Sequence, residues 1–235
     1  MASSDDIRIL PGDPPVTLTL RRSARARRLS LRVSRLDGRV TLTLPARASE
    51  RPALAFAQER AAWIREALAR MPAPETVGEG TQLSVEGRPL TLVAPPGRGA
   101  PRIEGDQLLL PGGAARAGIR AQAFLKALAR ERLASACARH AAELGLRHGK
   151  LTLRDTRSRW GSCTAEGHLM FSWRLILAPP AVLDYVAAHE VAHLARMDHS
   201  PAFWAVVARL MPGYQAPRAW LKREGQDLHG YRFGG

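Results

Sequence analysis

The sequence predicts an α+β fold in which a β-rich first part precedes a second part with long helices and a small sheet. Between residues 7 and 111, short segments alternate apolar and polar residues with the period of two that is typical of half-buried strands. After residue 114, two longer segments carry apolar residues at helical spacing, with strand-like segments between them. We therefore expect an N-terminal β-rich region over residues 1–113 and a second domain over residues 114–235.

The first part is expected to contain strands, one helix and further hairpins. Three segments alternate clearly between apolar and polar residues: VTLTL at 16–20, RRLSLRVSR at 27–35 and GRVTLTLP at 38–45. A helix is expected over residues 49–70, because Ser49 is a suitable N-cap and apolar residues follow at helical spacing. The segments after it predict short hairpins, and the loop PGGAA at 111–115 predicts the domain boundary.

The second part is expected to alternate helices with strands. An Ala-rich helix is expected over residues 115–144, and strands are expected within KLTLRDTRSRWGSCTAEGHLMFSWRLIL, which ends at residue 177. Pro179 and Pro180 stop the last strand and fix the first turn of a helix that runs to about Met197. Because that helix carries apolar residues on two faces, we expect it to be buried.

Composition limits the class of protein. No apolar segment approaches the roughly 20 residues that span a bilayer, and the N-terminus lacks a secretory signal, so a cytoplasmic protein is expected. The two cysteines, Cys137 and Cys163, have no CxxC spacing, which favours reduced thiols over a disulfide or a zinc knuckle. The net charge of +14 invites a nucleotide or nucleic-acid partner. Because nearly all of the basic residues are arginines, as in proteins from GC-rich genomes, this charge supports an anionic partner only weakly.

One helical segment carries a candidate metal site. In AHEVAHLARMDHSPAFW, residues 188–204, His189 and His193 lie on the same helix face, one turn or roughly 6 Å apart. Two imidazoles so placed can bind one zinc ion. Glu190 is offset by about 100° around the helix, where a general base for water activated by the metal should lie. The alternative is a buried helix with hydrogen-bonded histidines, but several buried imidazoles beside a carboxylate are costly without a shared ligand.

The third ligand is predicted by spacing. His199 follows His193 by six residues, as in HExxHxxGxxH enzymes, although Arg196 stands where those enzymes have glycine. The competing ligand is an acid from a later segment, and Glu224 is the best such residue. Three nitrogen ligands with an open fourth position are typical of catalytic zinc, whereas structural zinc usually has four protein ligands. We therefore expect one zinc ion per chain, held by His189, His193 and His199.

Several segments resemble a known family. SRWGSC, FSWRLILAPPAVLDYVAAHEVAHL, MDHSPAFW and PGYQAPRAWL together resemble the YgjP-like metallopeptidase family, which is related to SprT-like and zincin-type zinc proteases. RRSARARRLSLRV and ERAAWI in the first part also resemble the N-terminal region of that family. The resemblance implies a zincin-like catalytic domain with an HExxH active-site helix, in which His189, His193 and His199 bind zinc and Glu190 is the base. The resemblance indicates the residues of the metal site more closely than it indicates the substrate.

Residues outside this motif are candidates for substrate binding. Arg157 and Arg159 in RSRWGSC could bind an anion or a developing oxyanion, or lie in solvent around a packed Trp160. Tyr214 could donate a hydrogen bond to a tetrahedral intermediate, or pack in a turn. The arginine-rich run over residues 21–35 could contact phosphates, or form a solvated strand face.

Three functions remain open. The preferred one is an intracellular zinc-dependent peptidase that acts on peptides or unfolded proteins, with an edge strand within residues 168–177 that pairs with an extended peptide. The second is a metal-dependent hydrolase of phosphoanhydrides such as nucleoside triphosphates, with arginines that bind phosphate. The third is a nucleic-acid-binding module with a secondary metal site, which the intact Glu190 disfavours. No membrane partner is expected.

Overall fold

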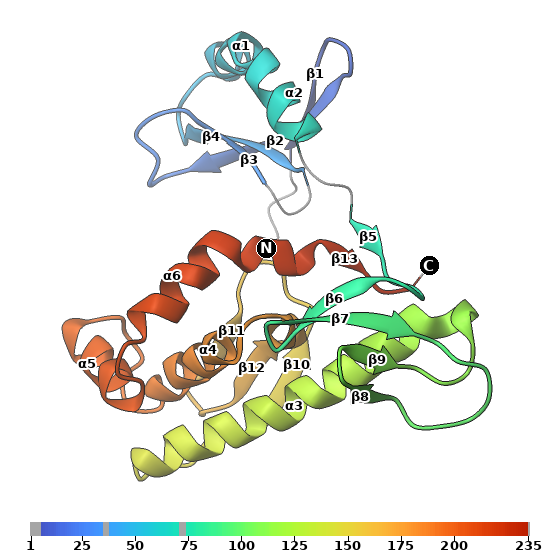
Figure 1. Ribbon diagram of the computed structural model, residues 1–235. Coiled ribbons are helices and arrows are strands. Elements are labelled where there is room, and N and C mark those ends of the chain that lie inside the picture. Colours follow the sequence, from blue (N-terminus) through green and yellow to red (C-terminus); the bar gives the residue numbers. More distant parts are fainter. Residues whose placement is uncertain (1–5, 35–37, 71–73, 235) are drawn as a thin grey trace. The chain divides into compact units, whose positions relative to one another are not determined.

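The computed structural model describes residues 6–34, 38–70 and 74–234, and it divides into two compact units (Figure 1). The first unit is Met1–Ala73 and the second is Pro74–Gly235. Each unit has a hydrophobic core of its own. In the described part of the chain, no helix has the length and apolar character needed to cross a membrane.

The first unit is a four-stranded sheet with helices packed on one face (Figure 1). Its elements are β1 (Asp6–Leu10), β2 (Val16–Ser23), β3 (Ser30–Val33), β4 (Val40–Pro45), α1 (Glu50–Glu59) and α2 (Ala61–Ala69). The strand order is β1-β2-β4-β3, with a parallel inner pair and antiparallel outer pairs. Alternate residues of the inner strands, such as Leu18 and Leu42, are fully buried in one cluster with Ile64 of α2.

The helix expected over residues 49–70 is interrupted at Arg60. The backbone there has φ of −97° and ψ of 7°, so α1 ends and α2 begins at this residue. The buried helix positions keep helical spacing across the break: Ala53, Ala57, Ala61 and Ile64. Both helices therefore bury one continuous face, as the sequence predicts for a single helix.

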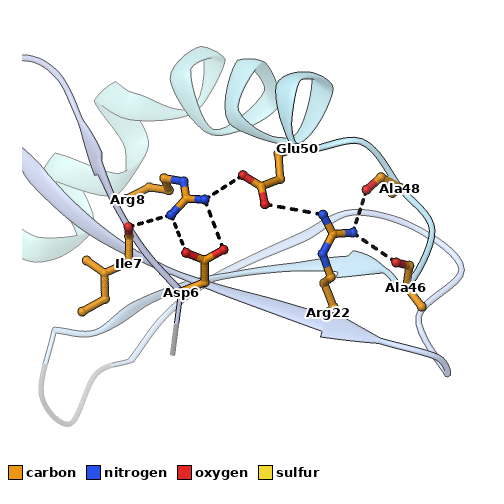
Figure 2. Close-up of polar contacts among 7 residues, drawn as sticks. All are labelled: Asp6, Ile7, Arg8, Arg22, Ala46, Ala48 and Glu50. Carbon is orange, nitrogen blue, oxygen red and sulfur yellow. Dashed lines mark hydrogen bonds and ion pairs between the residues drawn. The ribbon is translucent and has the colours of Figure 1, made fainter. Parts of the chain in front are cut away.

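An arginine of the run over residues 21–35 has a structural role in this unit (Figure 2). Arg22 donates to the carbonyl oxygens of Ala46 and Ala48 at 3.1 and 2.8 Å and to the Glu50 carboxylate at 3.5 Å. These contacts connect β2 to the first turn of α1. Arg35, at the end of the run, lies outside the described residues.

The second unit begins with a sheet of the same topology. Its elements are β6 (Gln82–Val85), β7 (Arg88–Val93), β8 (Arg102–Glu104) and β9 (Gln107–Leu109), followed by the short helix η1 (Ala114–Arg116) and the long α3 (Ala117–Glu143). The order β6-β7-β9-β8 again has a parallel inner pair and antiparallel outer pairs. Each unit thus contains four strands in the same arrangement, with a helix after the last strand.

This sheet belongs to the second unit, so the structure divides the chain after Ala73 and not after residue 113, where the sequence predicts the boundary. The strands bury their apolar residues in one cluster with α3 and later helices; among these residues are Leu83, Leu92, Leu108, Leu125 and Val186. A sheet buries its apolar face only against another layer, and α3 provides that layer here. The loop at 111–115 is therefore a turn within one core.

The remaining elements of the second unit lie before and after α4 (Pro180–Ala192) in the chain. They are β5 (Glu75–Thr76), β10 (Leu151–Arg154), β11 (Gly161–Cys163), β12 (Leu169–Ser172), η2 (Trp173–Leu177), α5 (Pro201–Leu210), α6 (Gln215–Glu224), η3 (Gly225–His229) and β13 (Tyr231–Arg232). The three-stranded sheet has the order β10-β12-β11, with β12 parallel to β10 and antiparallel to β11. The pairing of β13 with β5 joins the two ends of this unit.

Three sequence predictions for this region are wrong. The strand within residues 168–177 is β12, which is the central strand of its sheet, so the edge strand beside α4 is β11 instead. The chain after Ser172 forms a 3₁₀ helix and not a further strand. The helix expected to reach Met197 ends at Ala192, because the backbone continues in tight turns with bonds three residues back.

Candidate metal centre

Three histidines lie together at the end of α4. His189 is in the last turn of α4, His193 is the residue at which that helix ends, and His199 lies just before α5. Their possible ligand nitrogens all lie within 4.8 Å of one another. The Nε2 atoms of His189 and His199 are 3.2 Å apart, close to the separation of about 3.3 Å that two tetrahedral zinc–nitrogen bonds require.

His189 and His193 favour the neutral imidazole, which has a free electron pair for a metal. Nδ1 of His193 lies 3.0 Å from the carbonyl oxygen of Arg196, and because a carbonyl only accepts, Nδ1 donates and Nε2 is left as the ligand atom. Burial, together with His193 and His199, lowers the pKa of His189 to about 4. Burial also lowers the pKa of His193. Converging nitrogens that resist protonation fit a bound cation such as zinc.

One phenylalanine packs against all three imidazoles. Phe203 of α5 is fully buried. The centroid of its ring lies 5.0, 4.5 and 4.8 Å from the ring centroids of His189, His193 and His199, respectively. Sequence reasoning did not assign it a role, although it stands four residues after His199 in the segment HSPAFW and therefore one helical turn away.

Glu190 lies between α4 and the edge strand β11. The Glu190 side chain is buried, with 6% exposed. Burial raises its pKa to about 7, while the charge of Arg159 acts in the opposite direction. A Cβ atom on Gly161 of β11 would lie 2.6 Å from both Cγ and Oε1 of Glu190. Position 161 therefore has to be glycine for the strand to approach the carboxylate. The segment RSRWGSC alone does not predict this role, because the role depends on the contact between β11 and α4.

The two predicted arginines are in different surroundings. Arg159, two residues before β11, is exposed and its charge acts on Glu190. Arg157 is also exposed, but its charge acts on His229 of η3. The structure thus brings Arg159 near the predicted base and associates Arg157 with another part of the unit.

Tyr214 and Glu224 lie outside the histidine cluster. The ring of Tyr214 is stacked on those of Tyr185 and Trp204, with centroid distances of 6.3 and 5.5 Å. Glu224, the competing third ligand, accepts a hydrogen bond from Nε of Arg223 at 2.7 Å. In the described residues the metal-ligand cluster contains three histidines and no acid from α6.

Trp204 and Arg218 were not predicted as site residues, but both lie beside the cluster. The ring centroid of Trp204 is 5.6 Å from that of His189 and 6.1 Å from that of His199. The Cζ atom of Arg218 lies 4.3 Å from the Trp204 ring centroid. Trp204 shares a local motif with His199, whereas Arg218 reaches the site from α6, so no local sequence pattern identifies it.

Imidazoles that converge beside a buried carboxylate are typical of metal-dependent hydrolases. A family model described as the YgjP-like metallopeptidase domain matches residues 27–224. The chain therefore belongs to the YgjP-like metallopeptidase family, whose members depend on a metal ion for hydrolysis.

Two further comparisons complete this result. Among solved structures, the chain is similar to the metallopeptidase zymogen abylysin of Pyrococcus abyssi. The sequence identity is 20% and the TM-score 0.35, over 38% of this chain and 93% of that chain. A search of curated proteins gave no significant match.

Proposed function

We propose that this chain is a zinc-dependent peptidase in which His189, His193 and His199 hold one zinc ion and Glu190 is the general base. The observation that carries the proposal is the convergence of three imidazoles beside a buried carboxylate at the end of α4. When bound, zinc supplies a Lewis acid that activates water and polarises a carbonyl group. Glu190 accepts the proton of the attacking water and returns it to the leaving amine, as a buried carboxylate next to the histidine cluster can do.

The open edge of β11 supports a peptide as the substrate. Within the described residues β11 pairs with β12 alone, so its other edge has free backbone groups. Gly161 brings this strand against Glu190. An extended peptide that adds to the edge would gain main-chain hydrogen bonds and bring its carbonyl groups to the base. This arrangement of α4 and a small sheet is the basis for a zincin-like active site in our proposal.

The two other hypotheses lack comparable support. The matching family model is that of a metallopeptidase and not of a nucleotide hydrolase or a nucleic-acid-binding module. Of the two arginines that phosphate binding was expected to need, Arg157 acts on His229, whereas only Arg159 acts on Glu190.

The test is the Glu190→Gln variant of zinc-loaded protein. It should keep its zinc, measured by elemental analysis, and lose cleavage of an unfolded protein by a factor on the order of 10², because the proton acceptor is removed. Glu224→Gln should keep both zinc and activity, whereas His199→Ala should lose zinc.

Loss of zinc in Glu190→Gln would show that Glu190 is a ligand, and unchanged turnover would show that it is not the base. Hydrolysis of nucleoside triphosphates that depends on Glu190, without any proteolysis, would replace the peptidase proposal with the phosphoanhydride alternative.

A further inference from the structure

A cavity of about 510 Å³ lies between α4, α6 and the start of β11. Its lining includes Trp160, Tyr185, Gln215, Arg218, Leu221 and Lys222. The cavity thus combines two aromatic rings with two cationic side chains. The proposed chemistry uses none of these residues.

The cavity adjoins the histidine cluster. The ring centroid of Tyr185 is 6.0 Å from that of His189. Arg218 lies over Trp204, whose ring is itself 5.6 Å from His189. Trp160 directly precedes the edge strand β11, and its carbonyl oxygen accepts a hydrogen bond from the backbone of Ser172 at 2.8 Å. A peptide along the edge of β11 would therefore have side chains that reach this cavity, because side chains alternate along an extended strand.

The positive charge in the cavity is not balanced. Arg218 and Lys222 are four residues apart on α6 and so lie on the same helix face. Across the described residues neither side chain forms an ion pair, whereas the neighbouring Arg223 is paired with Glu224. The lining residues that the structure describes include no acid.

We propose that this cavity is a substrate subsite that selects an acidic side chain, preferably glutamate, close to the scissile bond. The aliphatic part of the glutamate packs on Trp160 and Tyr185, and its carboxylate binds Arg218 and Lys222. The inference rests on the proposed peptidase function, since it names the substrate class of that same site. The shorter aspartate side chain offers less apolar surface to the aromatic rings.

The experiment first uses the zinc-loaded full chain and a mixture of unstructured peptides whose cleavage sites are identified by mass spectrometry. Acidic residues should be enriched at one position near the cut. For two peptides that differ only by Glu or Gln at that position, kcat/KM should favour Glu by about tenfold. In the double variant Arg218→Gln, Lys222→Gln the ratio of kcat/KM for the Glu and Gln peptides should fall towards one. The matched control is Arg223→Gln, which removes a charge from the same helix outside the cavity and should keep the ratio.

A binding measurement separates this inference from the peptidase proposal. Zinc-loaded Glu190→Gln is titrated with fluorescent Glu and Gln versions of one peptide. If no peptide is cleaved but the Glu version binds more tightly, and this preference is lost when Arg218 and Lys222 are also replaced, the subsite stands and the peptidase proposal fails. If the wild-type protein bound and cleaved the Glu and Gln peptides equally well, the subsite proposal would be wrong. It would also be wrong if the preference for Glu remained after both Arg218 and Lys222 were replaced. Binding of inorganic triphosphate through the same two cations, without any peptide preference, would assign the cavity to phosphate.

Discussion

A single glycine sets how closely the edge strand approaches the proposed base. An added methyl group at position 161 would lie 2.6 Å from the Glu190 side chain, and real contacts of that kind do not occur. Gly161→Ala should therefore displace the carboxylate and lower kcat/KM by roughly tenfold or more while zinc content is unchanged. Gly78→Ala is the control, because its added methyl group meets no atom within 4 Å. Equal activity of both variants would contradict the close approach.

The two thiols are predicted to be inert. Burial raises the pKa of Cys137 to about 12 and that of Cys163 to about 11, with smaller contributions from nearby carboxylates. At pH 8 both should react far more slowly with an alkylating reagent than in the unfolded chain, since the thiolate is the reactive form. Rapid alkylation of native protein, measured by mass spectrometry, would contradict this.

The same shifts have a consequence for stability. The ordinary thiol pKa is about 8.5, so the folded chain holds these protons more tightly than the unfolded chain does. This contribution to stability is complete below about pH 8.5 and is lost as the pH rises towards the folded-state values. Replacing Cys137 by alanine should remove the contribution of that thiol to the pH dependence of unfolding and leave the contribution of Cys163.

At the scale of elements, local signals predict helix starts better than helix ends and strand partners. Pro180 begins α4 as its sequence position indicates. The end of α4 depends on the tight turns after Ala192, which bring His199 back to His189 without the expected glycine. The edge position of β11 depends on its pairing with β12, which is a contact between segments and leaves no periodic pattern.

The start of α5 positions two residues of the candidate metal centre. The Ser200 hydroxyl accepts a hydrogen bond from the Phe203 backbone at 3.4 Å and donates one to Asp198 at 2.9 Å. Ser200→Ala should lower the free energy of unfolding by about 1 kcal/mol, and it should weaken zinc binding because His199 and Phe203 flank this cap.

Ser49 provides the matched control for that variant. It is the N-cap residue of α1, but its side chain makes no capping hydrogen bond. Ser49→Ala should therefore change neither stability nor zinc affinity appreciably. Denaturant titration and a competing chelator measure the two quantities. Equal effects of the two serine variants would show that the Ser200 cap does not organise the metal centre.

At the scale of the molecule, the sequence correctly predicts a β-rich beginning followed by a second part that mixes helices and strands. The boundary could not be predicted, because loop composition marks turns inside a core as readily as links between cores. The loop at 111–115 is such a turn. The strand order that the two sheets share, β1-β2-β4-β3 and β6-β7-β9-β8, could not be predicted either, because it depends on which strands pair and not on a local residue pattern.

The position of the boundary leads to a prediction for two fragments. Residues 74–235 contain the whole second core, so this fragment should fold cooperatively and bind about one zinc ion. Residues 114–235 lack the strands that cover α3, and their removal exposes Leu125 and its neighbours to water. Because each buried leucine contributes roughly 1.5–3 kcal/mol, that shorter fragment should show no cooperative unfolding and should bind zinc weakly. Thermal unfolding and zinc analysis of both fragments decide the question. If the shorter fragment matched the longer one in both measurements, the sheet of β6 to β9 would be dispensable and the boundary would lie at residue 113 after all.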